Sequence, residues 1–198
     1  MDHHSDSIDR TRRTVLTVVA AGGVAAVAGC LDDDRSGPDP IDIDGESECD
    51  YCSMRIGMHP GPVGQAFYGD DAPPSLPDDR EGGVAWFCSS TCTYNFLLEN
   101  EERGHEPQIS YGTDYSLVEY ELFDDGGVTV ISAHLEAEVF ADLRDLTFVA
   151  NSDVEGAMGG SLIGFTDADE AAAFADEHGG ELLEHDDVTR EVLSGLGM

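Results

Sequence analysis

Lysine is absent from this chain of 198 residues, and arginine supplies all nine of its permanently basic side chains. Aspartate and glutamate number 42, so the formal net charge at neutral pH is −33. Such an acidic surface cannot provide the basic patch that binds the phosphate backbone, which excludes nucleic acid as a partner. It is typical of proteins adapted to high salt, because dissolved ions screen the repulsion among carboxylates.

The sequence also lacks the motifs of the common enzyme classes. It has no Gly-x-Ser-x-Gly, no phosphate-binding loop and no dinucleotide-binding fingerprint. His105, His134 and His178 are isolated along the chain, and we expect each to be a structural or solvated side chain. We therefore predict that the protein is not an enzyme.

The N-terminal apolar run, from Val15 to Gly29, is too short and too rich in glycine and alanine for a comfortable membrane-spanning helix. Arg12-Arg13 precede it, as in a twin-arginine export signal. The run ends at Cys30 in a pattern that resembles a lipobox, whose cysteine becomes acylated. We predict a signal over residues 1–29, lipidation at Cys30 and a domain anchored to the membrane outside the cytoplasm. A plain N-terminal anchor helix is the alternative.

The segment that follows is acidic and contains Pro38 and Pro40, so residues 30–48 are predicted to form a flexible tether that contributes no core. The first folded unit, residues 49–123, holds both cysteine pairs. Its predicted elements are strands at Val63–Tyr68, Val84–Phe87 and Leu117–Phe123, and a helix that starts at Ser89–Thr91 and ends near Arg103.

The second unit, residues 124–190, begins with a hairpin turn at Asp124–Gly127 and a strand at Val128–Ile131. Further strands are predicted at Leu146–Val149, Leu162–Phe165 and Glu181–Glu184, with a helix at 170–177 that is capped from within 166–169. Phe87 and Phe96 recur as Phe165 and Phe174 at the same spacing across a strand–helix junction. We predict an α+β fold of two small tandem ββαβ units behind a cleaved or lipidated leader.

Four cysteines remain after Cys30, in the pairs Cys49-Asp-Tyr-Cys52 and Cys88-Ser-Ser-Thr-Cys92. Thiolates are soft ligands that select Cu(I), Zn(II) and iron–sulfur clusters. Cys88 lies at the strand–helix junction and Cys92 one turn into the helix, so both sulfurs can point the same way. An even number of cysteines in an exported protein also permits two disulfides.

Methionine favours copper among these metals. Met54 lies two residues after Cys52, and Met158 lies in the glycine-rich turn of residues 156–160. A thioether suits copper and has no use in a structural zinc site. Met158 is either a ligand or a side chain that fills a gap between the units. The candidate metal ligands are Cys49, Cys52, Met54, Cys88, Cys92 and Met158.

These residues resemble one family, the nitrous oxide reductase accessory lipoproteins called NosL, and the acidic composition looks like that of a haloarchaeal member. The resemblance runs through Cys49-Asp-Tyr-Cys-Ser-Met54, Pro60-Gly-Pro62, Trp86-Phe-Cys-Ser89 and Gly156-Ala-Met-Gly159. It implies a Cu(I)-binding metallochaperone that delivers copper to nitrous oxide reductase or its ABC-type maturation complex in denitrification. It also implies two ββαβ units like those of organomercurial lyases.

The chain departs from the family pattern at two positions. Ser53 stands where the family commonly has glycine, and Cys92 where it commonly has an acidic residue. A cysteine at the second position makes the site resemble the metal-sensing domains called TRASH, so a structural zinc- or disulfide-stabilised interaction module without metal transfer stays open. A thiol–disulfide oxidoreductase using Cys49 and Cys52 is a third reading, and it lacks the thioredoxin-like βαβ context.

Overall fold

The computed structural model describes residues 37–78 and 80–196, and all of them belong to one compact unit. The predicted export signal and the lipidation site at Cys30 lie outside the described residues. Within the described ranges, every helix is too short or too polar to cross a membrane.

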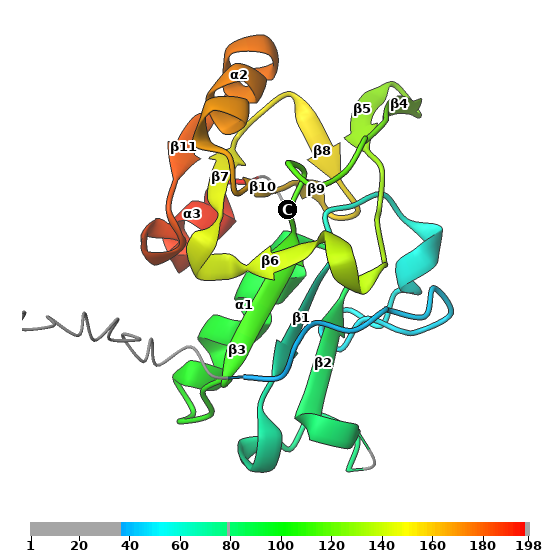
Figure 1. Ribbon diagram of the computed structural model, residues 1–198, viewed down its shortest axis with the longest axis vertical. Helices are drawn as coiled ribbons and strands as arrows, with labels where there is room; N and C mark the ends of the chain where they lie inside the picture. The colour runs from blue at the N-terminus through cyan, green and yellow to red at the C-terminus, as the bar shows by residue number, and fades with distance from the viewer. Residues whose placement is uncertain (1–36, 79, 197–198) are drawn as a thin grey trace, which may run out of the picture. The chain divides into compact units, whose positions relative to one another are not determined.

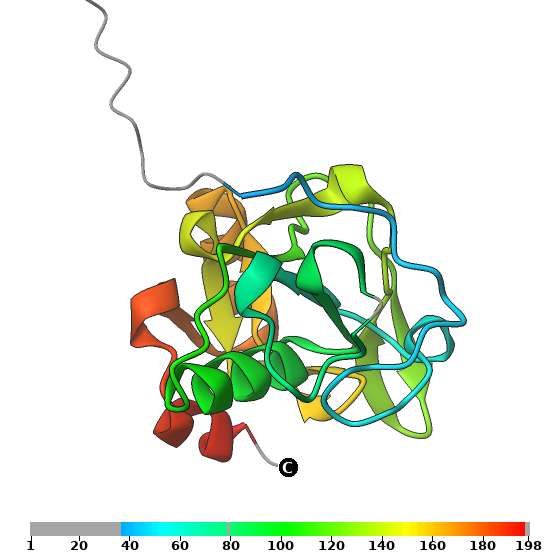
Figure 2. The same cartoon turned by 90° about the horizontal axis from the view of Figure 1, so that it is seen from below.

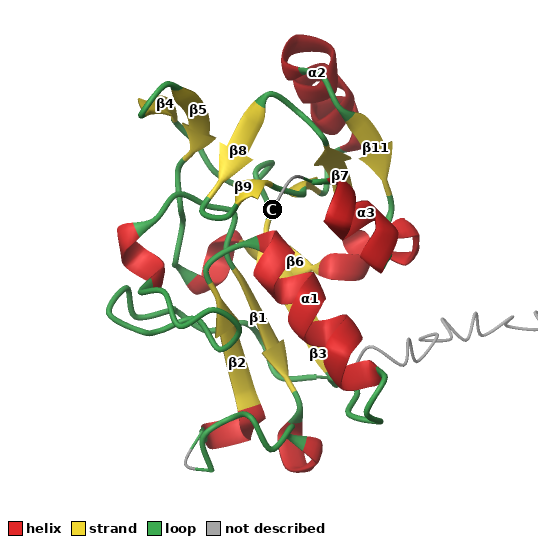
Figure 3. Cartoon of the chain, turned by 180° about the vertical axis from the view of Figure 1, so that it is seen from behind, coloured by secondary structure: helices red, strands yellow, loops and turns green. Residues whose placement is uncertain are grey.

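The first sheet has four antiparallel strands in the order β2-β1-β3-β6. They are β1 (Gly64–Phe67), β2 (Val84–Phe87), β3 (Ile109–Thr113) and β6 (Phe140–Asp142). The helix α1 (Ser90–Glu101) connects β2 to β3 and lies across one face of this sheet (Figure 3). Strand β2 forms an edge of the sheet, and its last residue is directly followed by Cys88.

The second sheet has three antiparallel strands in the order β10-β7-β11, which are β7 (Thr147–Ala150), β10 (Ile163–Phe165) and β11 (Glu181–Leu183). The helix α2 (Ala168–His178) connects β10 to β11 and packs against this sheet (Figure 1). Asp167 caps α2 by accepting hydrogen bonds from the N–H groups of Asp169 and Glu170. The order strand–strand–helix–strand therefore occurs twice, and the predicted α+β class is confirmed.

A third sheet, in the order β4-β5-β8-β9, was not predicted. It consists of β4 (Leu122–Asp125), β5 (Val128–Ile131), β8 (Val154–Gly156) and β9 (Gly159–Gly160), and β5 and β8 run parallel. The predicted hairpin is present, with Gly126 and Gly127 at positive φ between β4 and β5. The helix α3 (Arg190–Gly195) lies beside α1 (Figure 2). Short 3-10 turns occur at Ile56–Met58, Gly69–Asp71, Glu81–Gly83, Ala137–Val139, Leu143–Asp145 and His185–Asp187.

The last strand of the first ββαβ unit is β3, whereas the sequence predicted one at Leu117–Phe123. That prediction is wrong for residues 117–121, which form a bend and irregular chain before β4. Strand β3 lacks the alternation of apolar residues that would have predicted it, because the face that packs closely against other residues carries small side chains. A Cβ at Gly112, for example, would lie 2.8 Å from a methyl carbon of Leu143.

The two ββαβ units are joined by the buried side chain of Asp114, which directly follows β3. Its carboxylate accepts hydrogen bonds from the N–H and the hydroxyl of Thr166, at 2.9 and 2.5 Å, and from the N–H of Ser116 at 2.9 Å. The aromatic core is also shared, because Tyr94 of α1 packs edge-on against Phe148 of β7 at 5.7 Å between ring centroids.

The acidic segment before Cys49 packs onto the first sheet. The side chain of Ile43 is only 4% exposed, and its N–H donates to the carbonyl of Leu135 at 2.8 Å. The buried amide of Gln65 bonds to both the N–H and the carbonyl of Ile41, at 3.1 and 3.0 Å. The prediction that residues up to 48 contribute no core is therefore wrong, because isoleucines are interspersed among the acidic residues.

Candidate metal centre

Cys49 and Cys52 lie in a tight turn that precedes the first 3-10 segment. The N–H of Cys49 donates to the carbonyl of Met54, and the N–H of Ser53 donates to the carbonyl of Cys49, both at 2.8 Å. Ser53 has a φ of 63°, in the left-handed region that glycine adopts most readily. Glycine would adopt this backbone geometry without the strain that it imposes on serine.

Cys88 and Cys92 are positioned by the junction between β2 and α1. Ser89 is the N-cap of α1, and its hydroxyl accepts a hydrogen bond from the N–H of Cys92 at 3.0 Å. Cys92 therefore lies in the first turn of the helix, where the helix dipole favours a negative charge. The strand predicted at Val84–Phe87 and the cap predicted at Ser89–Thr91 are both confirmed.

The four thiol groups form one cluster, in which all sulfur atoms lie within 4.8 Å of one another. The sulfur of Cys88 lies 3.4 Å from that of Cys52 and 3.8 Å from that of Cys92. Sulfur ligands at about 2.3 Å around one tetrahedral metal would be separated by about 3.8 Å. All four are free thiols in the structure, and their spacing fits a single soft metal ion.

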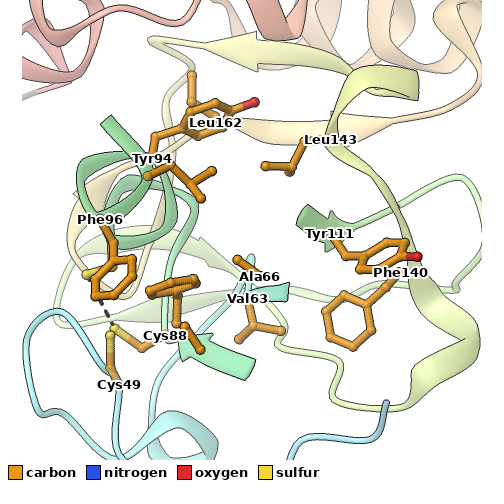
Figure 4. Packing of buried hydrophobic residues seen from close by; sticks show 14 of the residues in the cluster. Cys49, Val63, Ala66, Cys88, Tyr94, Phe96, Tyr111, Phe140, Leu143 and Leu162 are labelled. Atoms are coloured by element: carbon orange, nitrogen blue, oxygen red, sulfur yellow. Dashed lines mark hydrogen bonds between the residues drawn. The ribbon is translucent and has the colours of Figure 1, made fainter. Parts of the chain in front are cut away.

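The four cysteines of the cluster differ in how far solvent reaches them. Cys49, Cys88 and Cys92 are each no more than 2% exposed, whereas Cys52 is partly exposed. Cys49 approaches from the loop, and Cys88 approaches from the end of β2, at the margin of the hydrophobic core near Phe96 (Figure 4). A metal ion can therefore reach the buried sulfurs past Cys52.

The pKa values of the clustered thiols are shifted in opposite directions. Hydrogen bonds from the thiols of Cys88 and Cys92 lower the pKa of Cys49, although burial opposes this effect. The thiolate of Cys49 in turn raises the pKa of Cys88 and of Cys92. These shifts favour one thiolate, at Cys49, before any cation is present. A bound metal ion would displace the remaining protons, because it binds the thiolate form.

The two predicted thioether ligands, Met54 and Met158, are partly buried and pack against the same hydrophobic cluster that contains the buried cysteines. Met158 lies in the turn between β8 and β9, and this turn is held to the start of α1. The hydroxyl of Thr91 donates to the carbonyl of Gly160 at 3.2 Å, and the N–H of Leu162 donates to the hydroxyl of Ser90 at 2.9 Å. The structure thus brings the second unit's methionine to the helix end that carries Cys92.

A close backbone approach joins two of the sequence motifs in this region. The peptide bond between Gly61 and Pro62 is cis, and its carbonyl faces Gly156. A Cβ at Gly156 would lie 2.3 Å from the carbonyl oxygen of Gly61, so no larger residue fits there. The motifs around Pro60–Pro62 and Gly156–Gly159 therefore pack against each other.

Sequence reasoning missed the residues that hold the first cysteine turn in place. The side chain of Asp50, between the two cysteines, is paired with Arg80 and bonded to the N–H of Trp86. Burial raises the pKa of Asp50, and these two partners oppose that rise. The sequence carried one signal, namely that Asp50 lies inside the cysteine motif, but nothing connected it to an arginine in the proline-rich loop.

The histidines predicted to be structural or solvated all have partners away from the thiols. His105 bonds to the carbonyl of Asp71 at 3.1 Å, and His134 bonds to the hydroxyl of Ser132 at 3.0 Å. The ring of His178 packs at a tilt against that of Phe174, with 4.6 Å between the centroids. Met58, in the same loop as Met54, is 68% exposed. Among the described residues, the four cysteines form the one group of thiol, imidazole or carboxylate ligands close enough to hold a metal ion.

Comparisons with known proteins point in one direction. Residues 40–193 match the model of the NosL family. The chain is 28% identical over 180 residues to the copper-binding lipoprotein NosL of Stutzerimonas stutzeri, an alignment that covers 91% of this chain and 81% of that protein. The crystal structure of the copper chaperone NosL from Shewanella denitrificans is similar, with a TM-score of 0.59 and 27% identity. That similarity covers 79% of this chain and 98% of the other.

Proposed function

The chain belongs to the NosL family, and we propose that this copper-binding chaperone carries its copper as Cu(I) in the four-cysteine cluster. The observation that carries the proposal is the convergence of four sulfur atoms within 4.8 Å, three of them buried and one partly exposed. The protein is a carrier and not an enzyme. Copper is its cargo, and it enters and leaves through the side that Cys52 borders.

Several features of the site favour Cu(I) over harder cations. Thiolate and thioether sulfurs are soft ligands, and among the described residues the ligand group close enough to hold an ion consists of four cysteines with no carboxylate oxygen. Cu(I) tolerates two or three ligands, so a partner protein can take over the ion one sulfur at a time. Met54 and Met158 are proposed as additional ligands that contact the ion during loading or release.

A structural zinc site is the second candidate, and one observation favours it. The sulfur separations of 3.4 and 3.8 Å are close to those around a tetrahedral ion with four thiolate ligands. Such a site would be closed, and its metal would stabilise the fold without being transferred. Competition between the two metals therefore distinguishes a carrier from a structural module.

The cellular setting is proposed from the leader and from the relatives. The relative from Stutzerimonas stutzeri is a lipoprotein, and Cys30 ends a segment with the pattern of a lipoprotein signal. We place the mature domain outside the cytoplasm, attached to the membrane through a lipid on Cys30 after twin-arginine export. The proposed recipients are nitrous oxide reductase or the ABC-type complex that matures it.

The metal proposal is tested by Cu(I) competition under anaerobic conditions with a chromophoric Cu(I) chelator. Cys52→Ser removes a sulfur from the cluster and should weaken Cu(I) binding by more than the ~10–100-fold typical of residues that only orient a ligand. His105→Ala, whose side chain bonds to Asp71, should leave Cu(I) affinity unchanged. Equal losses in the two variants, or stoichiometric zinc that persists through exhaustive copper competition, would remove the carrier function.

A further inference from the structure

Asp50 attaches the first cysteine turn to the edge of the first sheet. Its N–H donates to the carbonyl of Trp86 at 2.9 Å, and its carboxylate accepts a hydrogen bond from the N–H of Trp86 at 2.7 Å. Trp86 lies in β2, the edge strand of that sheet, whose outer N–H and carbonyl groups have no neighbouring strand. Asp50 therefore forms hydrogen bonds with the outward-facing backbone groups of Trp86, as a further strand would.

Arg80 fixes the side chain of Asp50 from the proline-rich loop that precedes β2. Its guanidinium forms two hydrogen bonds to the two carboxylate oxygens, at 2.8 and 3.0 Å, and a third to the carbonyl of Val84 at 3.1 Å. It also stacks on the indole ring of Trp86, 3.9 Å from its centroid. The side chains of Arg80 and Asp50 are only 17% and 9% exposed, so this is an ordered, largely buried pair.

The pair connects the two halves of the thiol cluster. Asp50 directly follows Cys49, and Trp86 lies two residues before Cys88. The sulfurs of Cys49 and Cys88 both belong to the group of four whose members lie within 4.8 Å of one another. The turn is also held by its own hydrogen bonds, by the segment before it and by an exposed bond from the hydroxyl of Tyr51 to Glu99 of α1 at 3.2 Å. The Asp50–Arg80 pair is the largely buried contact that joins the turn to the strand leading to Cys88, so we expect the position of Cys49 relative to Cys88 to depend on it.

We propose that Asp50 and Arg80 are positioning residues of the copper site, which hold Cys49 and Cys52 at bonding distance from Cys88 and Cys92. This inference rests on the proposed function. The pair as a whole is neutral, so its effect on the metal is geometric rather than a matter of net charge. Without it, the turn is held less firmly against β2, and the sulfurs of Cys49 and Cys52 contact the ion only part of the time.

A metal-free experiment tests the geometry directly. The reduced full-length protein is treated briefly with iodoacetamide, and the alkylated cysteines are identified by peptide mass. In the parent protein Cys52 should react first, because it is the partly exposed member of the cluster. In Arg80→Met and in Asp50→Asn, Cys49 should become as reactive as Cys52, while Cys88 and Cys92 remain protected.

The second measurement is Cu(I) affinity together with the number of sulfur ligands from X-ray absorption. Arg80→Met should lower the affinity by about 10–100-fold, the range found when an outer partner of a metal ligand is removed. The average number of sulfurs around copper should fall below that of the parent protein. Arg80→Lys should restore only part of the affinity, because an ammonium group lacks the planar fork that binds both oxygens and stacks on the indole.

Arg144→Met is the matched control. Arg144 pairs through two nitrogens with Asp142, whose side chain is also 9% exposed, and this pair belongs to β6 and the turn after it. The variant should keep the alkylation pattern, the Cu(I) affinity and the sulfur number of the parent protein. If Arg80→Met does not fold, Asp50→Asn carries the same comparison, since the neutral amide no longer forms the ion pair with Arg80.

The outcomes separate this inference from the proposed function. Unchanged alkylation of Cys49 in both variants, with Cu(I) affinity within about twofold of the parent, would overturn the positioning role, and so would an equal loss in Arg144→Met. A parent protein that binds no Cu(I) would overturn the copper function alone. The alkylation pattern would still decide whether the pair positions the thiols.

Discussion

Cys92 is the residue that most changes the chemistry of this site. Its N–H is bonded to the hydroxyl of Ser89, so its sulfur is held at the first turn of α1, 3.8 Å from the sulfur of Cys88. An acidic residue at this position would offer oxygen, which suits harder ions. The cysteine completes a set of four thiol sulfurs, to which the thioethers of Met54 and Met158 are proposed to add.

Met158→Leu tests whether the thioether of the second unit takes part in binding. Leucine keeps the volume and apolarity of methionine, so the free energy of unfolding of the metal-free protein should fall by less than about 1.5 kcal/mol. Cu(I) affinity should fall clearly, since leucine has no lone pair to offer a soft cation. Denaturant unfolding and chelator competition on one preparation measure both quantities. Unchanged affinity would make Met158 a packing residue and confine the site to the four cysteines.

At the scale of elements, the strand and helix that carry Cys88 and Cys92 could be predicted because their signals are local. Val84–Phe87 is an apolar run of strand length, and Ser89 is a preferred N-cap residue directly after it. Two close cysteine pairs can meet once the chain folds, but their spacing alone did not require the approach of all four sulfurs to within 4.8 Å. Strand β3 could not be predicted in this way, because Ser110 and Gly112 replace apolar residues where the chain packs closely.

The pairing of Asp50 with Arg80 was equally inaccessible, for a different reason. Nothing in an isolated arginine indicates that it will fold back over Trp86 to reach a carboxylate far away in the chain. The same holds for Asp114, whose partners Ser116 and Thr166 come from different units. Local patterns predict elements, but the polar contacts that join elements depend on a tertiary arrangement that the patterns do not specify.

His185 joins the turn before α3 to the helix α1, and its titration should make this contact sensitive to pH. The hydroxyl of Tyr94 lies 2.9 Å from the Nδ1 atom of His185. Burial lowers the pKa of His185, and the nearby carboxylates of Asp186 and Asp142 offset this only in part, while Arg144 adds to it. Below the ordinary histidine pKa of about 6.5, the unfolded chain therefore binds a proton that the folded protein resists.

The free energy of unfolding should consequently fall as the pH drops below about 6.5, and His185→Gln should lose less stability over the same interval. Urea unfolding of the two proteins at about pH 7.5 and about pH 5.5, in constant high salt, isolates this contribution, since the carboxylates titrate in both. The same loss in both proteins would show that the His185 contact contributes nothing to the pH dependence.

At the scale of the whole molecule, repulsion among the acidic side chains opposes the compact state that the hydrophobic core stabilises. A net charge of −33 opposes compaction, and high salt relieves that repulsion. The larger of two hydrophobic clusters nevertheless spans both units, because it contains Phe87 and Phe96 of the first and Phe148 and Leu162 of the second. A smaller cluster lies around Tyr115, Phe165 and Phe174. A cluster shared between the units buries more apolar surface than two small separate domains would, which favours stability in a short chain.

The segment before Cys49 belongs to this folded body, and a pair of isoleucines tests that conclusion. Ile43 is 4% exposed and Ile41 is 40% exposed, and the two lie in the same extended stretch. Ile43→Ala removes buried methyl groups and should lower the free energy of unfolding by about 2–5 kcal/mol. Ile41→Ala should change it by less than about 0.5 kcal/mol, because its bonds to Gln65 are made by the backbone. Denaturant unfolding in high salt measures both, and equal, small effects would mean that the folded body begins only at Cys49.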